Sequence, residues 1–262
     1  MSAPALGLAG APAGPPAGAP LIEVTGLAIG WAGNVLLRDA TFAVERGAVF
    51  VILGGSGCGK STLLRHLVGL EAPLEGRIAV GGLPPTLDGG RPRFGVTFQS
   101  GALIGSLTVG ENVALPLREW TDLPLDAIGA IVAAKLRLVG LPHAEDLLPS
   151  ELSGGMRKRA AIARAMALEP DLLFLDEPSA GLDPVAAAEL DQLIVELNGQ
   201  LGLTCVVVTH DLESIFTIGR SCIMLDRESQ SLIARGDPRV LRDDPDPRVH
   251  AFFNRTPRPV AP

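Results

Sequence analysis

Residues 54–61 read Gly54-Gly55-Ser56-Gly57-Cys58-Gly59-Lys60-Ser61, directly after the continuous apolar run of residues 49–53. The apolar run is typical of a strand that is buried on both faces, and the pattern after it predicts a helix over residues 60–69. The glycine-rich segment matches G-x-x-x-x-G-K-[ST], in which backbone N–H groups surround phosphate oxygens and a helix N-terminus adds positive potential. The sequence therefore predicts a phosphate-binding loop between a strand and a helix.

The residue types of this loop indicate a nucleotide and a metal ion. Lys60 can reach the β- and γ-phosphates, and the Ser61 hydroxyl is a ligand for Mg²⁺. We expect ATP and Mg²⁺ as cofactors, with ATP contacted by Gly54, Gly55, Ser56, Gly57, Cys58, Gly59, Lys60, Ser61 and Thr62. Oxidation of Cys58 would obstruct the loop, although a cysteine here also fits a position under no particular constraint.

A second apolar run, residues 172–175, ends in the carboxylates of Asp176 and Glu177. Because side chains alternate along a strand, the two carboxylates point in different directions. We expect Asp176 to hold Mg²⁺ and Glu177 to face an attacking water as general base. Taken alone, an Asp-Glu pair also fits a polar strand end.

The remaining pattern predicts strands that alternate with helices. Strands are expected at residues 21–29, 36–44, 49–53, 172–175 and 204–208, and helices at residues 125–139 and 156–168 and after Asp183-Pro184. Proline suits the first position of a helix, where its missing N–H is not needed. This alternation predicts an α/β fold with a largely parallel sheet.

Composition excludes some classes of protein. The chain has 262 residues, of which 47% are apolar and 19% charged, so it can bury a sizeable core. Its net charge of −7 disfavours binding to nucleic acid, so we expect no nucleic acid as a partner. No apolar run has the ~18 residues of a membrane span, and no secretory signal is visible. Three cysteines without a C-x-x-C pair indicate reduced thiols in a cytoplasmic protein.

The two ends of the chain have a different composition from the middle. Residues 1–20 contain 16 Ala, Gly or Pro and no charge, which predicts a disordered leader. From Arg235 onward, proline and arginine become frequent. We therefore expect a C-terminal tail over residues 237–262 that lies outside the core, apart from a short helix near residues 249–253.

Leu152-Ser153-Gly154-Gly155-Met156 lies between the phosphate loop and the Asp-Glu strand. These residues, in this order, resemble the signature sequence of ABC-type ATPases. Further elements are similar to the same family: Gln99 to the Q-loop glutamine, residues 179–183 to the D-loop, His210 to the switch histidine and Trp31 to the aromatic residue that stacks on adenine. The resemblance covers residues 21–236.

Single members of this set have simpler explanations. Gln99 alone would be a surface polar residue, and a lone His210 after an apolar strand would be a structural histidine. Trp31 also fits packing under a small sheet. It is the order of the five elements along one chain that favours the resemblance.

The resemblance implies the P-loop NTPase fold of the ABC type, with a mostly parallel core sheet, a small antiparallel β-subdomain and a helical subdomain at residues 100–170. Two copies of such a chain pack head to tail, and each ATP lies between the phosphate loop of one copy and the signature of the other. The implied roles are catalytic for Glu177, His210 and Gln99, metal-binding for Ser61, Gln99 and Asp176, and nucleotide-binding for Trp31, Ser153, Gly154, Gly155 and Asp183. A single copy should then bind ATP but hydrolyse it poorly.

A membrane partner is also implied. Without a membrane span of its own, the chain would need a permease encoded as a separate chain. In this family the segment equivalent to residues 100–117 receives a coupling helix of the permease, and its apolar residues Ala102, Leu103, Ile104, Leu107 and Val109 suit a docking groove. The same residues also fit the core of the helical subdomain.

Short stretches of the sequence narrow the class of substrate that we expect. Residues 98–103, 106–109, 111–117 and 152–159 resemble the lipid-asymmetry (Mla-type) subfamily. Many importers have a glutamine in place of Met156. The resemblance implies an ATPase that moves phospholipid between membranes, at the cytoplasmic face of the inner membrane, with a permease and a periplasmic MCE-domain protein. An ATPase of a polar-solute importer is the alternative, and a soluble ABC ATPase without a permease is the second alternative.

Overall fold

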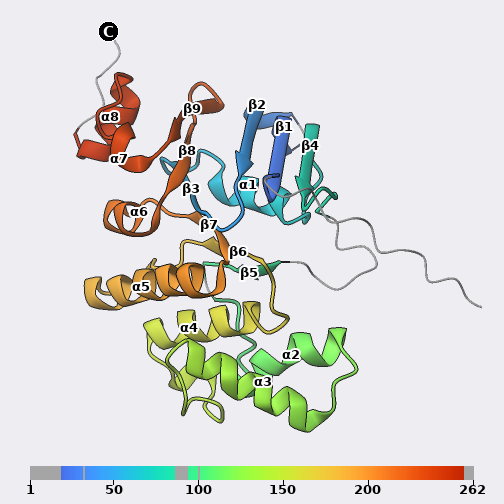
Figure 1. Cartoon of the computed structure of the whole chain (residues 1–262). Helices are drawn as coiled ribbons and strands as arrows, with labels where there is room; N and C mark the ends of the chain where they lie inside the picture. The colour runs from blue at the N-terminus through green and yellow to red at the C-terminus, as the bar shows by residue number, and fades with distance from the viewer. Residues whose placement is uncertain (1–18, 32, 86–93, 100, 257–262) are drawn as a thin grey trace, which may run out of the picture.

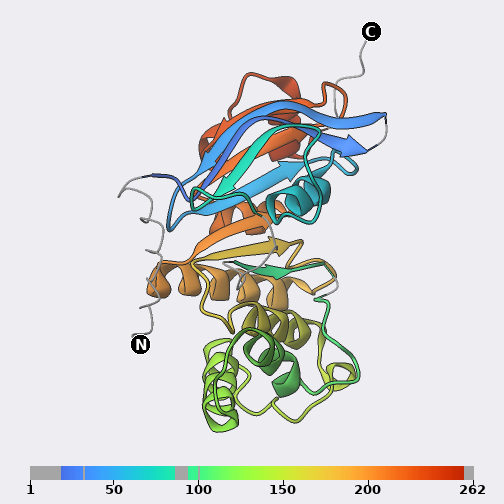
Figure 2. The ribbon, with the colours of Figure 1, turned by 90° about the vertical axis from the view of Figure 1, so that its right-hand side faces the viewer.

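The computed structural model describes residues 19–31, 33–85, 94–99 and 101–256, and they form two sheets and a helical layer (Figures 1 and 2). The smaller sheet is antiparallel, with strand order β2-β1-β4. The larger sheet has the order β5-β6-β7-β3-β8-β9 and is parallel except for the pairing of β8 with β9. The strands are β1 (Ile22–Trp31), β2 (Asn34–Val44), β3 (Val49–Gly54), β4 (Glu75–Val80), β5 (Gly95–Thr97), β6 (Leu172–Asp176), β7 (Thr204–Val208), β8 (Ser221–Asp226) and β9 (Ser231–Gly236).

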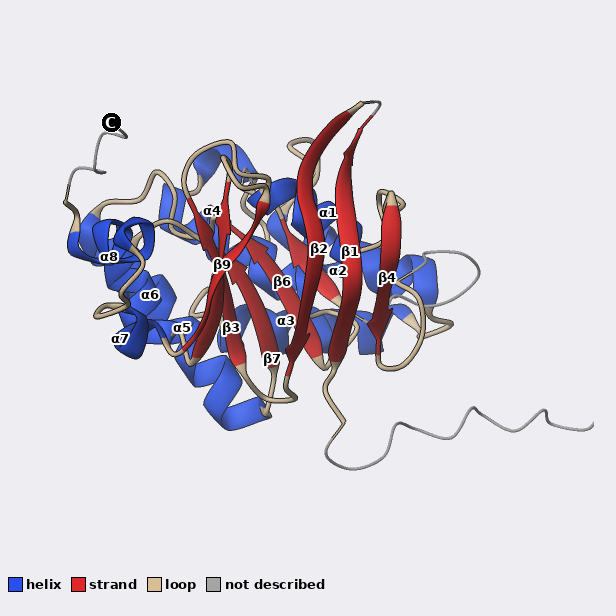
Figure 3. Cartoon of the chain, turned by 90° about the horizontal axis from the view of Figure 1, so that it is seen from above, coloured by secondary structure: helices blue, strands red, loops and turns tan. Residues whose placement is uncertain are grey.

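Strands β3, β6 and β7 of the larger sheet are buried on both faces, as their continuous apolar runs predict. Along β3, Val51 and Leu53 pack into the core that faces the helical layer, whereas Phe50 and Ile52 pack into the core under the small sheet. This alternation follows from the two-residue period of a strand. Figure 3 shows the small sheet and the large sheet from above, with the strands of both running across the molecule.

Helices fill both sides of the large sheet. Helix α1 (Lys60–Leu67) belongs to the core shared with the small sheet, whereas the other helices lie on the far side. These are α2 (Val109–Trp120), α3 (Leu125–Leu138), a 3-10 turn (Pro149–Glu151), α4 (Gly154–Ala165), α5 (Pro184–Leu201), α6 (Leu212–Ile218), α7 (Pro238–Leu241) and α8 (Pro247–Asn254). In Figure 1, α2, α3 and α4 form a separate layer furthest from the small sheet.

Polar side chains fix where the functional helices begin. Ser153 caps α4, with its hydroxyl accepting a hydrogen bond from the Met156 N–H at 3.2 Å. Asp183 caps α5, and Pro184 occupies the first helical position as predicted. Helix α4 thus begins within the signature sequence, two residues earlier than expected, and the signature stands at a helix N-terminus.

The described residues from Arg235 onward complete β9 and form α7 and α8. The short helix expected near residues 249–253 corresponds to α8, whereas the expectation that the rest of the tail lies outside the core is wrong at α7, where Leu241 is buried. Leu241, Val249 and Phe253 are buried in the core on the helical side of the large sheet. Apolar side chains spaced along the short helices pack into this core. The Pro and Arg residues between them obscure the helical pattern of apolar residues in the sequence. Most of the expected leader, residues 1–18, lies outside the described residues, as does Ser100.

The residues expected to form the docking groove divide between the core and the surface. Val109 is fully buried in the core of the helical layer, so for this residue the core alternative holds and the groove alternative does not. Leu103 packs against the same core, whereas Ile104 is exposed. Among the described helices, none combines the length and hydrophobicity that crossing a membrane requires.

Candidate nucleotide site

The carboxyl ends of four parallel strands meet at one edge of the large sheet. The phosphate loop follows β3, Gln99 follows β5, Asp176 ends β6 and His210 follows β7. Open α/β sheets bind ligands at this edge. A cavity of about 680 Å³ lies here, and its lining includes Trp31, Leu36, Gly54, Gly55, Ser56, Gly57, Gly59, Lys60, Ser61, Thr62, Gln99, Glu177, His210 and Phe252.

The phosphate loop depends on glycine for its shape. Gly54 has a φ of 146°, and a Cβ atom there would come within 2.6 Å of the Leu225 carbonyl oxygen. The Lys60 ammonium group donates hydrogen bonds to the carbonyl oxygens of Gly54 (2.9 Å) and Gly55 (3.1 Å). The lysine thus curls back over its own loop, and its charge lies where the phosphate groups of a nucleotide would come.

Cys58 does not line this cavity. Its side chain is buried in the core under the small sheet, and burial raises the pKa of its thiol. The side chain therefore lies outside the cavity, and a contact of the Cys58 backbone with nucleotide stays a prediction. A buried thiol of raised pKa is also poorly disposed to oxidation, which favours a packing role for Cys58.

Ser61 and Asp176 bring two oxygen ligands together. The Ser61 hydroxyl donates a hydrogen bond to Oδ1 of Asp176 at 3.2 Å, across 115 residues of sequence. Burial raises the pKa of Asp176, and the hydrogen bond from Ser61 opposes this effect. Mg²⁺ takes hydroxyl and carboxylate oxygens and lowers the cost of burying such a carboxylate, so the pair fits this metal.

Glu177 and His210 form a second pair on the cavity wall. Nδ1 of His210 lies 2.8 Å from Oε1 of Glu177, with the histidine exposed and the glutamate side chain 11% exposed. Asp176 and Glu177 thus point to different partners, as expected, although Glu177 lies just beyond the end of β6. Glu177 also has a φ of 46°, a left-handed conformation that is uncommon outside glycine.

Trp31 and Gln99 lie at the rim of the cavity. Trp31 ends β1, is 55% exposed, and packs under neither sheet. Gln99 is exposed and follows β5 after a gap of one residue. Both side chains are therefore free to contact a nucleotide.

The signature and D-loop residues lie elsewhere in the same chain. Ser153, Gly154, Gly155 and Asp183 do not line the cavity. They adjoin one another, because a Cβ atom on Gly154 would lie 3.2 Å from the Leu182 side chain. Asp183 accepts hydrogen bonds from the N–H groups of Val185 and Ala186, so its carboxylate already serves as a helix cap.

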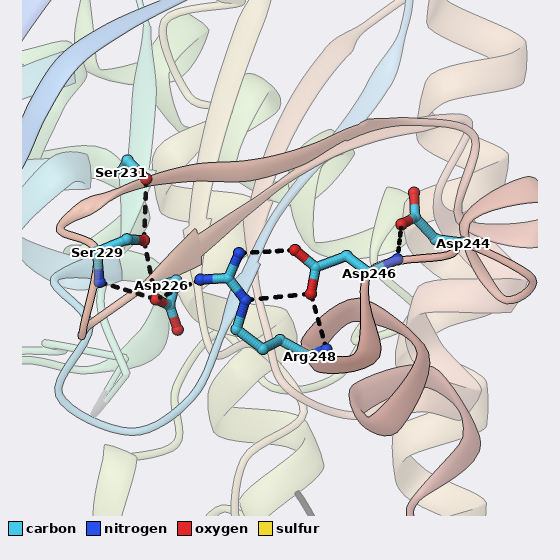
Figure 4. A network of polar contacts seen from close by, with 6 residues as sticks. All are labelled: Asp226, Ser229, Ser231, Asp244, Asp246 and Arg248. Carbon is cyan, nitrogen blue, oxygen red and sulfur yellow. Dashed lines mark hydrogen bonds and ion pairs between the residues drawn. The ribbon is translucent and has the colours of Figure 1, made fainter. Parts of the chain in front are cut away.

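Two lining residues escape prediction from the sequence. Leu36 comes from β2, and Phe252 comes from α8. Helix α8 is held in place by Arg248, whose guanidinium lies 3.2 Å from Asp226 at the end of β8 and 2.6 Å from Asp246 (Figure 4). Because β8 pairs with the strand that leads into the phosphate loop, this network fixes α8 beside the cavity.

The fold and the cavity define a phosphate-loop nucleotide-binding domain. The model of the family described as "ABC transporter" matches residues 37–180. The intermembrane phospholipid transport system ATP-binding protein MlaF of Escherichia coli K12 is 42% identical over 241 residues, covering 89% of this chain and 88% of that protein. The chain therefore belongs to the ABC transporter family, as an ATP-binding subunit and an ATPase.

Two further proteins are similar over most of the chain. The probable ribonucleotide transport ATP-binding protein mkl of Mycobacterium tuberculosis H37Rv is 42% identical over 239 residues, covering 89% of this chain and 66% of that protein. The dimeric ATP-binding cassette MJ0796, in a post-hydrolysis state with ADP and Pi, superposes with a TM-score of 0.73 at 27% identity, covering 82% of this chain and 98% of that chain. The fold expected from the sequence is thus confirmed.

Proposed function

We propose that this chain hydrolyses ATP to drive the movement of phospholipid between membranes, as the peripheral ATPase of a transporter at the cytoplasmic face of the inner membrane. The observation that carries this proposal is the 42% identity with MlaF over almost the full length of both chains. A polar solute remains a second candidate substrate, because the protein mkl has the same sequence identity, 42%, and is named for ribonucleotide transport. A soluble ABC ATPase without a permease is the remaining candidate.

In the proposed site, Glu177 is the general base that orients the attacking water. Its side chain borders the cavity, and its carboxylate lies 2.8 Å from His210, which lines the same cavity. Lys60 would exchange its bonds to Gly54 and Gly55 for phosphate oxygens, and Gln99 would close the rim. Phosphoryl transfer depends on such positioning and charge stabilisation more than on covalent chemistry.

Ser61 and Asp176 would hold Mg²⁺, with Gln99 as a third ligand. The fit rests on the 3.2 Å contact between the serine hydroxyl and the buried carboxylate. When bound, the ion neutralises charge that develops on the phosphate oxygens. The protein's contribution is to place both oxygen ligands beside Lys60 before the nucleotide arrives.

The site is proposed to be completed by a second copy of the chain. Ser153 is exposed at the N-terminus of α4, which bears positive potential. That end lines no part of the chain's own cavity, so its potential is free to face the γ-phosphate held by a partner copy. The dimeric state of the similar cassette with ADP and Pi supports this arrangement. Asp183 would take part through its loop, since its carboxylate caps α5.

A groove in the helical layer is the proposed contact with the permease. The groove has a volume of about 460 Å³ and is lined mostly by apolar residues, among them Val96, Leu115 and Trp120, together with the charged residues Glu119 and Arg164. Leu115 and Trp120 are 39% and 42% exposed. An apolar helix of a membrane protein suits such a groove. It lies at the far end of the segment expected for docking, beyond the buried Val109.

Purification from native membranes tests this function. A tagged Glu177→Gln chain is solubilised in detergent with Mg-ATP, and co-purifying proteins and lipids are identified by mass spectrometry. A permease with an MCE-domain protein and enriched phospholipid would support the phospholipid function. A permease with a solute-binding protein would replace it by a polar-solute importer, and no membrane partner at all would contradict both. A Trp120→Asp chain, altered only in the groove, serves as the control that should lose the permease.

A further inference from the structure

Lys158 joins two segments of the nucleotide site through their backbones. It lies on α4, one turn after the signature residues, and its ammonium group donates hydrogen bonds to the carbonyl oxygens of Gln99 (2.6 Å) and Glu177 (3.2 Å). These acceptors belong to segments 78 residues apart in the sequence, which follow β5 and β6 in the large sheet. A helix of the outer layer thus holds the site directly.

The contact with Glu177 supports an unusual backbone conformation. Glu177 has a φ of 46°, so its peptide groups depend on their surroundings to hold them. Its N–H group donates to the Val208 carbonyl at 2.8 Å, and its own carbonyl oxygen accepts from the Ala180 N–H at 3.2 Å and from Lys158. Among these hydrogen-bond partners of the Glu177 backbone, Lys158 is the one that uses its side chain, and it belongs to α4 rather than to the sheet.

The Lys158 side chain is half-buried, and its ammonium group contacts the two carbonyl oxygens. Burial lowers the pKa of its ammonium group, and the charges of Glu177 and Asp176 oppose this effect. A charge-assisted hydrogen bond to a carbonyl oxygen is stronger than a neutral one. The cation therefore fixes both carbonyl groups while leaving the Glu177 carboxylate free to pair with His210.

The same helix holds the continuation of the Gln99 segment further along. Arg164 donates to the carbonyl oxygens of Ala102 (2.7 Å) and Gly101 (3.2 Å), and Ala102 has a φ of 50°. Arg164 also borders the groove that we propose for the permease. Helix α4 therefore contacts the groove and the loop after β5 through Arg164, and Gln99 and the peptide of Glu177 through Lys158.

We propose that Lys158 is a positioning residue for ATP hydrolysis. Its hydrogen bonds keep the backbones of Gln99 and Glu177 at a fixed position relative to α4. A displacement of α4, at the groove or at the partner's nucleotide, therefore also moves the catalytic carboxylate. The inference rests on the proposed role of Glu177 as general base. Lys158 itself contacts neither nucleotide nor water in this role.

The test compares variants of the full-length chain at protein concentrations that allow two copies to associate. Lys158→Met removes the donor and keeps the length, whereas Lys158→Arg keeps a donor. Lys135→Met is the matched control, because Lys135 also lies in the helical layer and pairs at 3.2 Å with Glu169, away from the nucleotide. Each variant is measured for kcat and KM of ATP hydrolysis, for the Kd of a fluorescent ATP analogue and for Tm.

We expect Lys158→Met to lower kcat by about 10- to 100-fold, the loss typical of a misplaced catalytic group, with KM and Kd little changed. Lys158→Arg should recover most of kcat, and Lys135→Met should match the wild type. An unchanged kcat in Lys158→Met, or a parallel loss of kcat, Kd and Tm, would overturn the proposal. If the methionine variant does not fold, Lys158→Gln takes its place, with the same criteria.

The outcome is separable from the role of Glu177. Normal kcat in Lys158→Met beside an inactive Glu177→Gln chain would reject the positioning role alone. Normal hydrolysis by Glu177→Gln would reject the base on which both ideas rest.

Discussion

The imidazole of His210 lies 2.8 Å from the carboxylate of Glu177, although 33 residues separate them in the sequence. The two side chains leave neighbouring parallel strands, β6 and β7, at the same edge of the sheet. Glu177 also takes a left-handed φ of 46°. Both side chains line the cavity, where the carboxylate can orient a water molecule.

Glu177→Gln should keep ATP binding and lose hydrolysis. Glutamine preserves the shape of the side chain but cannot accept a proton, and removal of a general base typically costs 10²–10⁴-fold. The variant should also accumulate as an ATP-bound dimer, detectable by analytical ultracentrifugation with and without Mg-ATP. Hydrolysis within a few-fold of the wild-type rate would remove Glu177 as the base.

Lys60→Ala should weaken ATP binding. The ammonium group is proposed to exchange its bonds to Gly54 and Gly55 for phosphate oxygens, and each charged hydrogen bond contributes about 1.5–3 kcal/mol. One such bond corresponds to roughly a tenfold to hundredfold rise in Kd. Titration of a fluorescent ATP analogue measures it, and unchanged affinity would contradict the role of Lys60. The distant Lys135→Ala change is the control.

Much of the site could be predicted because its elements are local in sequence. The phosphate loop needs glycine where φ is positive, as at Gly54, and such a requirement is visible in a short motif. The buried strands appear as unbroken apolar runs, so β3, β6 and β7 were predictable within one residue. The order of the motifs then places their side chains at one edge of a parallel sheet.

Other features depend on tertiary contacts that no local pattern carries. Phe252 reaches the cavity because Arg248 ties α8 to Asp226, a contact across 22 residues. Lys158 reaches Gln99 across 59 residues. Helix α2 contains Pro116, which breaks the usual helix signal. Cys58 stands inside the motif, yet only the structure shows that its side chain points into the core.

A buried carboxylate predicts a pH dependence of stability. Asp191 on α5 is 3% exposed, and burial raises its pKa from 3.8 to about 6. The folded state then holds the proton more tightly than the unfolded state, so stability falls as the pH rises from about 4 through 6. Asp191→Asn should add up to about 3 kcal/mol to the free energy of unfolding at pH 8, and little at pH 4. Urea unfolding across this range checks it, and a gain independent of pH would argue against ionisation as the cause.

The anchor of α8 predicts the opposite dependence. Hydrogen bonds from Arg248 lower the pKa of Asp246 to about 2, so its contribution to stability is present above about 4 and is lost as the pH falls toward 2. Asparagine can still cap α8, so Asp246→Asn removes the charge alone. Because the pair is partly exposed, we expect a loss of about 1 kcal/mol or less at pH 7. Equal stability of both chains at pH 7 would show that the pair does not hold α8.

We propose that each nucleotide is shared between two copies of the chain. Lys60→Ala damages the phosphate loop, and Ser153→Arg damages the signature, so each variant alone should be inactive. In a mixed dimer one of the two sites combines the intact phosphate loop of one copy with the intact signature of the other. The most direct measurement is therefore ATP hydrolysis by the two variants mixed in equal amounts. We expect mixing to restore hydrolysis, and a mixture as inactive as its separate components would show that the nucleotide is not shared between two copies.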